Sequence, residues 1–213
     1  MNLAQYIEHT NLNESATEAD IKNLCKEALQ YGFYGVCIYP KWIKFAKSIV
    51  KDECKVITVI SFPKGDDPTE KKIEDTKQAI TDGADEIDMV INKERLKEGD
   101  DAYLLNDIKS VVKTAKKPVK VIIEAADLDI EQKKRAIQLV MQAGAAFVKT
   151  STGKSSAGGA TVEDVKLIKS IVGNKLGIKA AGGVGTREKA EAMIKAGATR
   201  LGASKSIEII KGI

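Results

Sequence analysis

The chain has 213 residues, of which 43% are hydrophobic and 30% charged, a balance typical of a folded globular protein rather than a disordered one. Its 34 basic and 30 acidic residues are mixed along the chain, without the concentrated basic stripe that is common in nucleic-acid-binding proteins. No run approaches about 18 apolar residues, and the N-terminus carries no basic segment followed by an apolar one. We therefore expect one cytoplasmic domain over residues 1–213, without nucleic-acid or membrane partners.

Eight apolar runs are candidate strands, and helical patterns fill the intervals between them. In chain order the expected strands cover residues 6–10, 35–39, 56–62, 86–91, 119–125, 147–151, 177–181 and 200–204. Signals for helix starts stand in several intervals. They are the capping-box patterns Ser15/Glu18 and Asp129/Gln132, the pair Asp67–Pro68 with proline at the first helical position, and the N-cap candidates Thr161 and Thr186.

One unit recurs along the chain: a helical run, a glycine, and then an apolar strand. The glycines are Gly32, Gly83, Gly144 and Gly197, each placed where a left-handed residue would end a helix. Aligning them brings four later residues to the same height on equivalent strands, namely Cys37, Asp88, Lys149 and Gly202. Eight strand–helix alternations predict an α/β fold, a single-domain (β/α)8 TIM barrel. A doubly wound open sheet is the structural alternative.

Charged residues interrupt strands that should be uniformly apolar if they lie inside a barrel. If the side chains that alternate with Ile87, Val148 and Ile178 point inward, Asp88, Lys149 and Lys179 meet within it. A structural ion cluster is one interpretation, because a buried ammonium is costly unless it is paired. TIM-barrel active sites, however, lie at the C-terminal ends of the strands, where these three residues stand.

Amine chemistry explains the three residues better than ion pairing does. A lysine attacks a carbonyl only as the free amine, and a second ammonium together with desolvation lowers its pKa towards the working pH. A nearby carboxylate then moves protons while the covalent intermediates form. We therefore predict that Lys149 reacts, Lys179 tunes its pKa and Asp88 transfers protons. This chemistry needs no metal or other cofactor, and no His/Cys/Asp cluster has metal-ligand spacing.

Three loops rich in Gly, Ser and Thr follow the late strands. Backbone N–H groups in such loops, with a helix N-terminus behind them, bind phosphate, although each glycine pair could also be only a tight turn. The predicted phosphate-binding residues are Gly153, Lys154, Gly182, Gly183, Gly202, Ser204 and Lys205. Three such loops at one end of adjacent strands predict a small phosphorylated substrate.

Several segments carry a resemblance that covers essentially the whole chain. They are residues 83–90 (GADEIDMV), 120–124 (KVIIE), 148–153 (VKTSTG) and 179–184 (KAAGGV), with 8–10 (EHT) and 202–204 (GAS) near the ends. In these segments the chain resembles the deoxyribose-phosphate aldolase family. The resemblance implies reversible cleavage of 2-deoxy-D-ribose 5-phosphate to D-glyceraldehyde 3-phosphate and acetaldehyde. It also implies a Schiff base on Lys149, with Lys179 and Asp88 as its partners.

The chain departs from the family pattern at two turns and at its end. Gly185 stands where the family usually places a basic residue, and Lys205 stands where it usually places a small one. The chain ends at Ile213, without the longer tail of larger members. We expect Lys205, with Lys154, to supply the positive charge that Gly185 cannot.

Two other functions are alternatives to this one. A second lysine-dependent aldolase, acting on a ketose phosphate, or a non-catalytic barrel that binds sugar phosphates would share many of these features.

His9, the only histidine, is expected to be a polar cap of the barrel mouth rather than a catalyst. Cys37 fits either the pocket or the core. The three cysteines lack CxxC spacing, which favours free thiols in a reducing compartment. Barrels of this kind often pair as homodimers.

Overall fold

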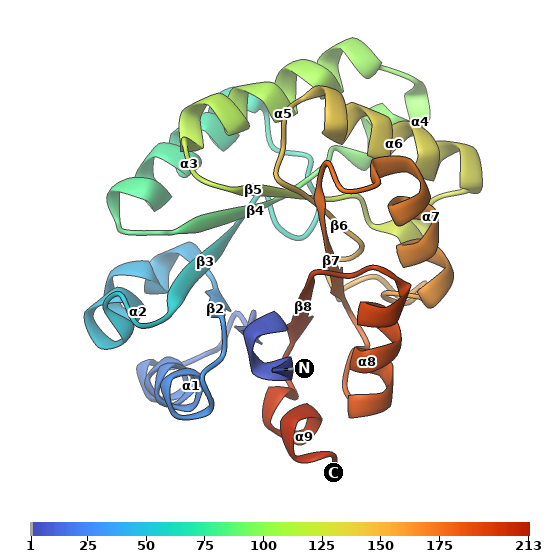
Figure 1. Cartoon of the computed structure of the whole chain (residues 1–213). Helices are drawn as coiled ribbons and strands as arrows, with labels where there is room; N and C mark the ends of the chain where they lie inside the picture. The colour runs from blue at the N-terminus through green and yellow to red at the C-terminus, as the bar shows by residue number, and fades with distance from the viewer. Residues whose placement is uncertain (1) are drawn as a thin grey trace.

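The computed structural model describes residues 2–213 and shows a closed barrel of eight parallel strands inside a ring of helices (Figure 1). Each strand pairs with the next, and β1 pairs with β8, which closes the sheet and excludes the open-sheet alternative. The strands are β1 (Ile7–Asn11), β2 (Gly35–Ile38), β3 (Lys55–Ile60), β4 (Glu86–Val90), β5 (Val119–Ile122), β6 (Phe147–Lys149), β7 (Gly177–Ala181) and β8 (Arg200–Ala203). The TIM-barrel prediction is confirmed.

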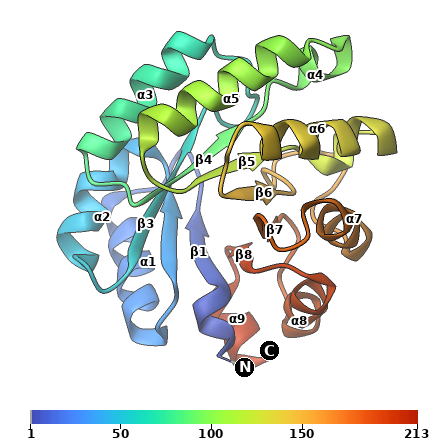
Figure 2. The same ribbon diagram turned by 45° about the horizontal axis from the view of Figure 1, so that its top comes forward.

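The helices cover the outside of the barrel, and Figure 2 shows this layer from a second direction. The α-helices are α1 (Glu18–Tyr31), α2 (Ile43–Val50), α3 (Thr69–Thr81), α4 (Lys93–Glu98), α5 (Asp101–Ala115), α6 (Ile130–Gln142), α7 (Val162–Val172), α8 (Arg187–Ala196) and α9 (Ser206–Lys211). Three short 3-10 helices complete the described chain: η1 (Leu3–Tyr6), η2 (Pro40–Trp42) and η3 (Ala125–Asp127). The apolar core lies between the strands and this helical layer. Within residues 2–213, no helix is both long and apolar enough to span a bilayer.

The repeated glycine ends helices as predicted. Gly32, Gly83, Gly144 and Gly197 all have positive φ, between 65° and 121°. Because a side chain is strained in this region, glycine lets the chain turn from each helix into the next strand.

The helix starts agree with the sequence at three positions and differ at two. Thr161 and Thr186 are N-caps, and Asp129 with Gln132 forms a capping box. The Ser15/Glu18 prediction is wrong, because the box that forms is Thr17 with Asp20. The Pro68 prediction is wrong by one residue. Pro68 is the N-cap and α3 begins at Thr69.

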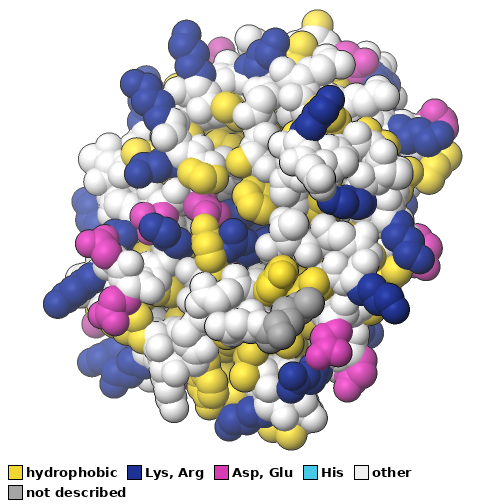
Figure 3. All heavy atoms as spheres, viewed as in Figure 1, with side chains coloured by type: hydrophobic (Ala, Val, Ile, Leu, Met, Phe, Trp, Pro, Cys, Tyr) yellow, Lys and Arg dark blue, Asp and Glu magenta, His cyan; other side chains and the backbone are white. Residues whose placement is uncertain are grey.

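Basic and acidic side chains alternate across the face of the molecule shown in Figure 3. This distribution agrees with the mixed charge pattern in the sequence. The strongest concentration of charge is instead buried inside the barrel.

Candidate active site

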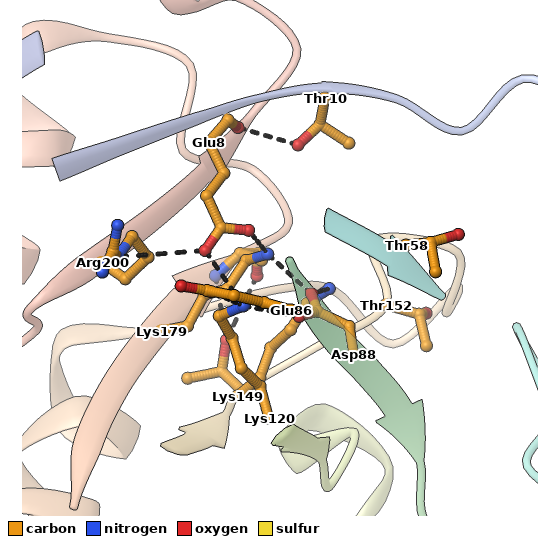
Figure 4. A network of polar contacts seen from close by, with 12 residues as sticks. Glu8, Thr10, Thr58, Glu86, Asp88, Lys120, Lys149, Thr152, Lys179 and Arg200 are labelled. Carbon is orange, nitrogen blue, oxygen red and sulfur yellow. Dashed lines mark hydrogen bonds and ion pairs between the residues drawn. The ribbon is translucent and has the colours of Figure 1, made fainter. Parts of the chain in front are cut away.

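Asp88 of β4, Lys149 at the end of β6 and Lys179 of β7 meet inside the barrel (Figure 4). The Nζ atoms of Lys149 and Lys179 lie 2.8 and 2.6 Å from the same carboxylate oxygen, Oδ2 of Asp88. All three side chains are buried. The inward orientation predicted from alternation with Ile87, Val148 and Ile178 is therefore what the barrel adopts.

A second layer of charge lies deeper in the barrel. Lys120 Nζ is 3.0 Å from Asp88 Oδ1 and 3.4 Å from Glu8 Oε1, and it also pairs with Glu86. Glu8 forms a further ion pair with Lys179. Lys120 is thus paired with three carboxylates, those of Glu8, Glu86 and Asp88.

Arg200 completes this deeper layer from β8. Its guanidinium carbon lies 3.1 Å from the centroid of the Tyr34 ring, and its Nε lies 3.9 Å from Glu8 Oε1. Tyr34 in turn donates a hydrogen bond to Glu86. The arginine is thus held by an aromatic face on one side and a carboxylate on the other.

Sequence reasoning missed Glu8 and Arg200 as members of this cluster. Arg200 stands two residues before Gly202, as Glu86 stands two before Asp88, so strand alternation places each pair on one face. That spacing is a usable signal for Arg200. Glu8 had no such signal, because the short polar segment around it shows no apolar alternation.

The cluster holds its charges strongly. Burial alone would lower the pKa of Lys120 and of Lys179, but attraction to Asp88 and Glu8 outweighs it and raises both. Burial would raise the pKa of Asp88, yet the surrounding ammonium groups of Lys120, Lys149 and Lys179 hold it well below its usual value. Lys120 and Lys179 are therefore firmly cationic partners of an ionised Asp88.

Charge balance separates Lys149 from the other two lysines. Among the described residues in the barrel interior, the cations Lys120, Lys149, Lys179 and Arg200 face the carboxylates Glu8, Glu86 and Asp88. The cluster thus has one positive charge in excess. Because a net charge is costly in a buried site, loss of one proton is favoured there. Lys149 contacts only Asp88 among these carboxylates, whereas Lys120 contacts three of them and Lys179 two.

The oxygens of this cluster are already occupied by ammonium groups. Glu8, Cys37 and Asp88 present potential metal-ligand atoms within 4.8 Å of one another. The carboxylates are nevertheless bound by Lys120, Lys149 and Lys179. Burial also raises the pKa of the Cys37 thiol, which keeps it protonated and a poor metal ligand. The arrangement suits amine chemistry better than metal binding.

A cavity of about 870 Å³ opens above Lys149 at the C-terminal ends of the strands. Every residue predicted to bind phosphate lines it: Gly153, Lys154, Gly182, Gly183, Gly202, Ser204 and Lys205. Asp88 and Lys179 lie beneath the cavity, fully buried. Lys149 is thus the member of the trio that reaches the cavity wall.

Lys205 lies beside Gly185, which stands where a basic residue was expected from the resemblance. A Cβ atom added to Gly185 would be 3.6 Å from Lys205 Cδ, an ordinary van der Waals distance. Lys205 is the N-cap of α9, one position earlier than the first helical turn. Its side chain therefore shares the space that a longer residue at 185 would enter.

The loop after Lys149 is fastened to the loop after β5. Glu124, buried and in the left-handed conformation with φ 52°, accepts hydrogen bonds from the backbone and hydroxyl of Thr152. Asp127 accepts one from Ser155 and pairs with Lys93. A strained backbone at a buried acid is common in functional sites, and here it aims Glu124 at Thr152.

Two residues left open by the sequence now have positions. Cys37 is fully buried inside the barrel, where it packs with Leu12, Ile57 and Val59, and it is not among the residues of the cavity wall. His9 lines the cavity at the barrel mouth, and its ring bonds to Glu27 of α1 and Ser206 of α9. Its position agrees with the expected polar residue at the mouth, and it also joins two helices to the barrel.

Comparison with known proteins agrees with this site. The chain is 52% identical to the deoxyribose-phosphate aldolase of Thermococcus gammatolerans, covering 100% of this chain and 96% of that one. It is 51% identical to the deoxyribose-phosphate aldolase of Clostridium botulinum, over 99% and 100% of the two chains. The solved deoxyribose phosphate aldolase of Aeropyrum pernix superposes with a TM-score of 0.91 at 31% identity, covering 98% of this chain and 89% of that one. The model of the DeoC/LacD family aldolases matches residues 2–210, and the chain belongs to this family.

Proposed function

We propose that this protein is a class I aldolase that reversibly cleaves 2-deoxy-D-ribose 5-phosphate to D-glyceraldehyde 3-phosphate and acetaldehyde. The observation that carries the proposal is the position of Lys149, which reaches the cavity and shares Asp88 with Lys179. The names of the relatives at about half identity over the whole chain support the substrate.

Lys149 is the nucleophile in this proposal. Its free amine adds to the aldehyde carbon of the open-chain sugar, and loss of water gives the protonated imine. Removal of the proton from the 3-hydroxyl then breaks the bond between carbons 2 and 3, and its electron pair moves to the protonated imine. This step releases glyceraldehyde 3-phosphate and leaves a two-carbon enamine on Lys149. Protonation and hydrolysis of the enamine release acetaldehyde and restore the amine.

Asp88 is placed to handle protons during these steps, and Lys179 to hold Asp88 ionised. The carboxylate lies within hydrogen-bond distance of both amines, so it can pass a proton to or from Lys149 directly or through water. Lys179 cannot easily take over the role of nucleophile, because Glu8 and Asp88 raise its pKa.

The Gly-rich wall of the cavity binds the phosphate in this proposal. The Gly182–Thr186 turn leads into α8, a helix of 10 residues whose N-terminal N–H groups attract anions. Lys154 and Lys205 stand on the same wall and add positive charge. A single phosphate therefore meets backbone donors and lysine side chains together.

Borohydride trapping tests the proposal directly. The protein is incubated with deoxyribose 5-phosphate, reduced and mapped by peptide mass spectrometry, with Lys149→Ala as the variant and Lys93→Ala as a control lysine on α4. We expect an adduct on Lys149 in the wild type and the control, and none in Lys149→Ala. An adduct on Lys179 alone would reverse the roles. Binding without any adduct would favour the non-catalytic barrel.

Product analysis separates the two aldolase alternatives. Cleavage of deoxyribose 5-phosphate yields acetaldehyde, whereas cleavage of a ketose phosphate yields a ketone product. Acetaldehyde is measured with alcohol dehydrogenase and NADH. Release of a ketone with no acetaldehyde would favour the ketose phosphate.

The three cysteines and the assembly lead to two smaller proposals. Cys25, Cys37 and Cys54 are free and buried, which supports a reducing, cytoplasmic location. We also propose a homodimer, to be measured by light scattering, although the solved relative from Aeropyrum pernix is described as a tetramer. A monomer or a tetramer in solution would contradict the dimer.

A further inference from the structure

His9 links three parts of the chain that lie far apart in sequence. Its Nδ1 is 2.9 Å from the hydroxyl of Ser206, and its Nε2 is 2.8 Å from a carboxylate oxygen of Glu27. The ring packs against Phe33, with centroids 5.2 Å apart. His9 and Ser206 are buried, and Figures 1 and 2 both show α9 beside the start of the chain. One imidazole thus joins β1, α1 and α9.

The contacts of His9 reach the backbone through Ser206. The carboxylate of Glu27 accepts a hydrogen bond from Nε2, and Nδ1 is hydrogen-bonded to Ser206 Oγ. Ser206 Oγ also donates to the carbonyl of Ala203, at 3.0 Å. The ring and Ser206 together form a chain of polar contacts that ends on the backbone of Ala203.

Ala203 is the residue at which β8 gives way to the lysine-bearing loop. His9 and Ala203 are the last paired residues between β1 and β8. Ser204 and Lys205 follow at once and line the cavity. The backbone pairing and the Ser206 bond therefore hold Ala203 from two sides, and the direction in which Lys205 leaves the barrel depends on both.

The residue types Ser, His and Glu also occur in hydrolases, but this trio cannot act as one. Ser206 is fully buried and its proton is committed to Ala203, so no substrate carbonyl can approach its oxygen. The cluster's effect must pass through the backbone that it holds.

We propose that His9 is a positioning residue for phosphate recognition. Through its hydrogen bond with Ser206 it fixes the loop of Ala203, Ser204 and Lys205, so that Lys205 faces the phosphate of the substrate. This inference rests on the proposed function, since it assumes a phosphorylated substrate in the cavity. His9 itself touches none of the reacting atoms in this scheme.

Two substitutions of His9 separate positioning from simple packing. The amide nitrogen of asparagine stands as many bonds from Cα as Nδ1 does, whereas that of glutamine matches Nε2. His9→Asn should therefore keep the bond to Ser206, and His9→Gln should lose it. Loss of one buried hydrogen bond corresponds to about a two- to tenfold effect. We expect His9→Gln to raise KM for deoxyribose 5-phosphate by that factor at unchanged kcat, and His9→Asn to stay near the wild type.

Unphosphorylated deoxyribose and a remote variant serve as controls. Neither His9 variant should alter kcat/KM for deoxyribose. Thr69→Val removes a buried hydrogen bond of 2.7 Å to Asp107, between α3 and α5, and should lower Tm without raising KM. If His9→Gln does not fold, Ser206→Ala removes the same link and should raise KM in the same way.

The possible outcomes separate the role of His9 from the proposed aldolase function on which it rests. A wild type that prefers deoxyribose 5-phosphate, with His9→Gln and Ser206→Ala both at wild-type KM, would overturn the positioning role alone. Equal rises of KM in His9→Asn and His9→Gln would also overturn it, because packing rather than the Ser206 bond would then be responsible. A wild type indifferent to the phosphate would refute the proposed function and this inference together.

Discussion

Lys149 and Lys179 share one oxygen atom. Their ammonium groups lie 2.8 and 2.6 Å from Oδ2 of Asp88, and Lys179 has Glu8 as a second anionic partner. Two like charges at one oxygen repel each other. Lys149 is the lysine of this pair that is held by a single carboxylate, and it is also the one that reaches the cavity.

Replacing Lys179 by leucine should make Lys149 harder to deprotonate. Removing a neighbouring ammonium takes away a charge that repels the Lys149 ammonium, so the pH profile of adduct formation should move to higher pH than in the wild type. Borohydride trapping over a pH series measures the shift. An unchanged profile would leave Lys179 with a positional or proton-transfer role instead.

Asp88→Asn should move the same profile in the opposite direction. Without the carboxylate the cluster carries a larger positive excess, which disfavours a further ammonium and favours the free amine of the nucleophile at lower pH. Turnover should nevertheless fall by about 100- to 10,000-fold, because the proton-transferring group is lost. Borohydride trapping measures adduct formation and steady-state kinetics measure turnover, both on one preparation. A parallel fall in the two rates would contradict the prediction.

Substitution of Lys120 or of Lys149 by methionine should affect stability unequally. Lys120→Met leaves Glu86 and Glu8 short of a partner and should cost about 3–5 kcal/mol of the free energy of unfolding. Lys149→Met removes the excess charge and leaves Asp88 paired, so its stability should stay within about 1 kcal/mol of the wild type. Urea denaturation measures the free energy of unfolding of both variants. Equal losses of stability would argue against an excess positive charge in the cluster.

Lys205→Ala should weaken recognition of the phosphate alone. A charge-assisted contact contributes about 1.5–3 kcal/mol, so KM for deoxyribose 5-phosphate should rise by roughly tenfold to a hundredfold. Activity on deoxyribose should hardly change. In the Lys205→Ala background, Gly185→Arg should recover part of the loss, since Lys205 no longer fills that space. Equal losses on both substrates, or no loss on either, would show that Lys205 does not read the phosphate.

The sequence predicts most of the barrel, because strand polarity and helix-ending glycines are local signals. For β7 the predicted and observed strands have the same bounds, 177–181. The strand expected over 119–125 instead ends at Ile122, because Glu124 adopts a left-handed conformation that an acidic residue seldom takes. The capping box was misplaced because two overlapping patterns, Ser15/Glu18 and Thr17/Asp20, satisfy the same rule.

Candidate site residues on long apolar strands were easier to place than those on short polar ones. Alternation with buried neighbours gives the orientation of Asp88 and Lys179 directly. Glu8 lies in a five-residue strand where polar residues outnumber apolar ones, so its inward direction emerges only from the closed sheet. The contact between His9 and Ser206 depends on β1 pairing with β8, which no local pattern encodes.

The fastening of Thr152 and Ser155 to Glu124 and Asp127 has a consequence for how this enzyme could be diversified. These bonds hold the loop at Thr152 and Ser155, while Ser156, Ala157 and Gly158 at its tip are exposed. Replacements or short insertions at the tip leave the bonds of Thr152 and Ser155 in place and do not reach the charged cluster inside the barrel. A library confined to residues 156–158 should therefore yield a high fraction of folded variants that still carry the reactive lysine. A library that also varies 124 and 152 should lose this tolerance, because the tip would then move without its anchor.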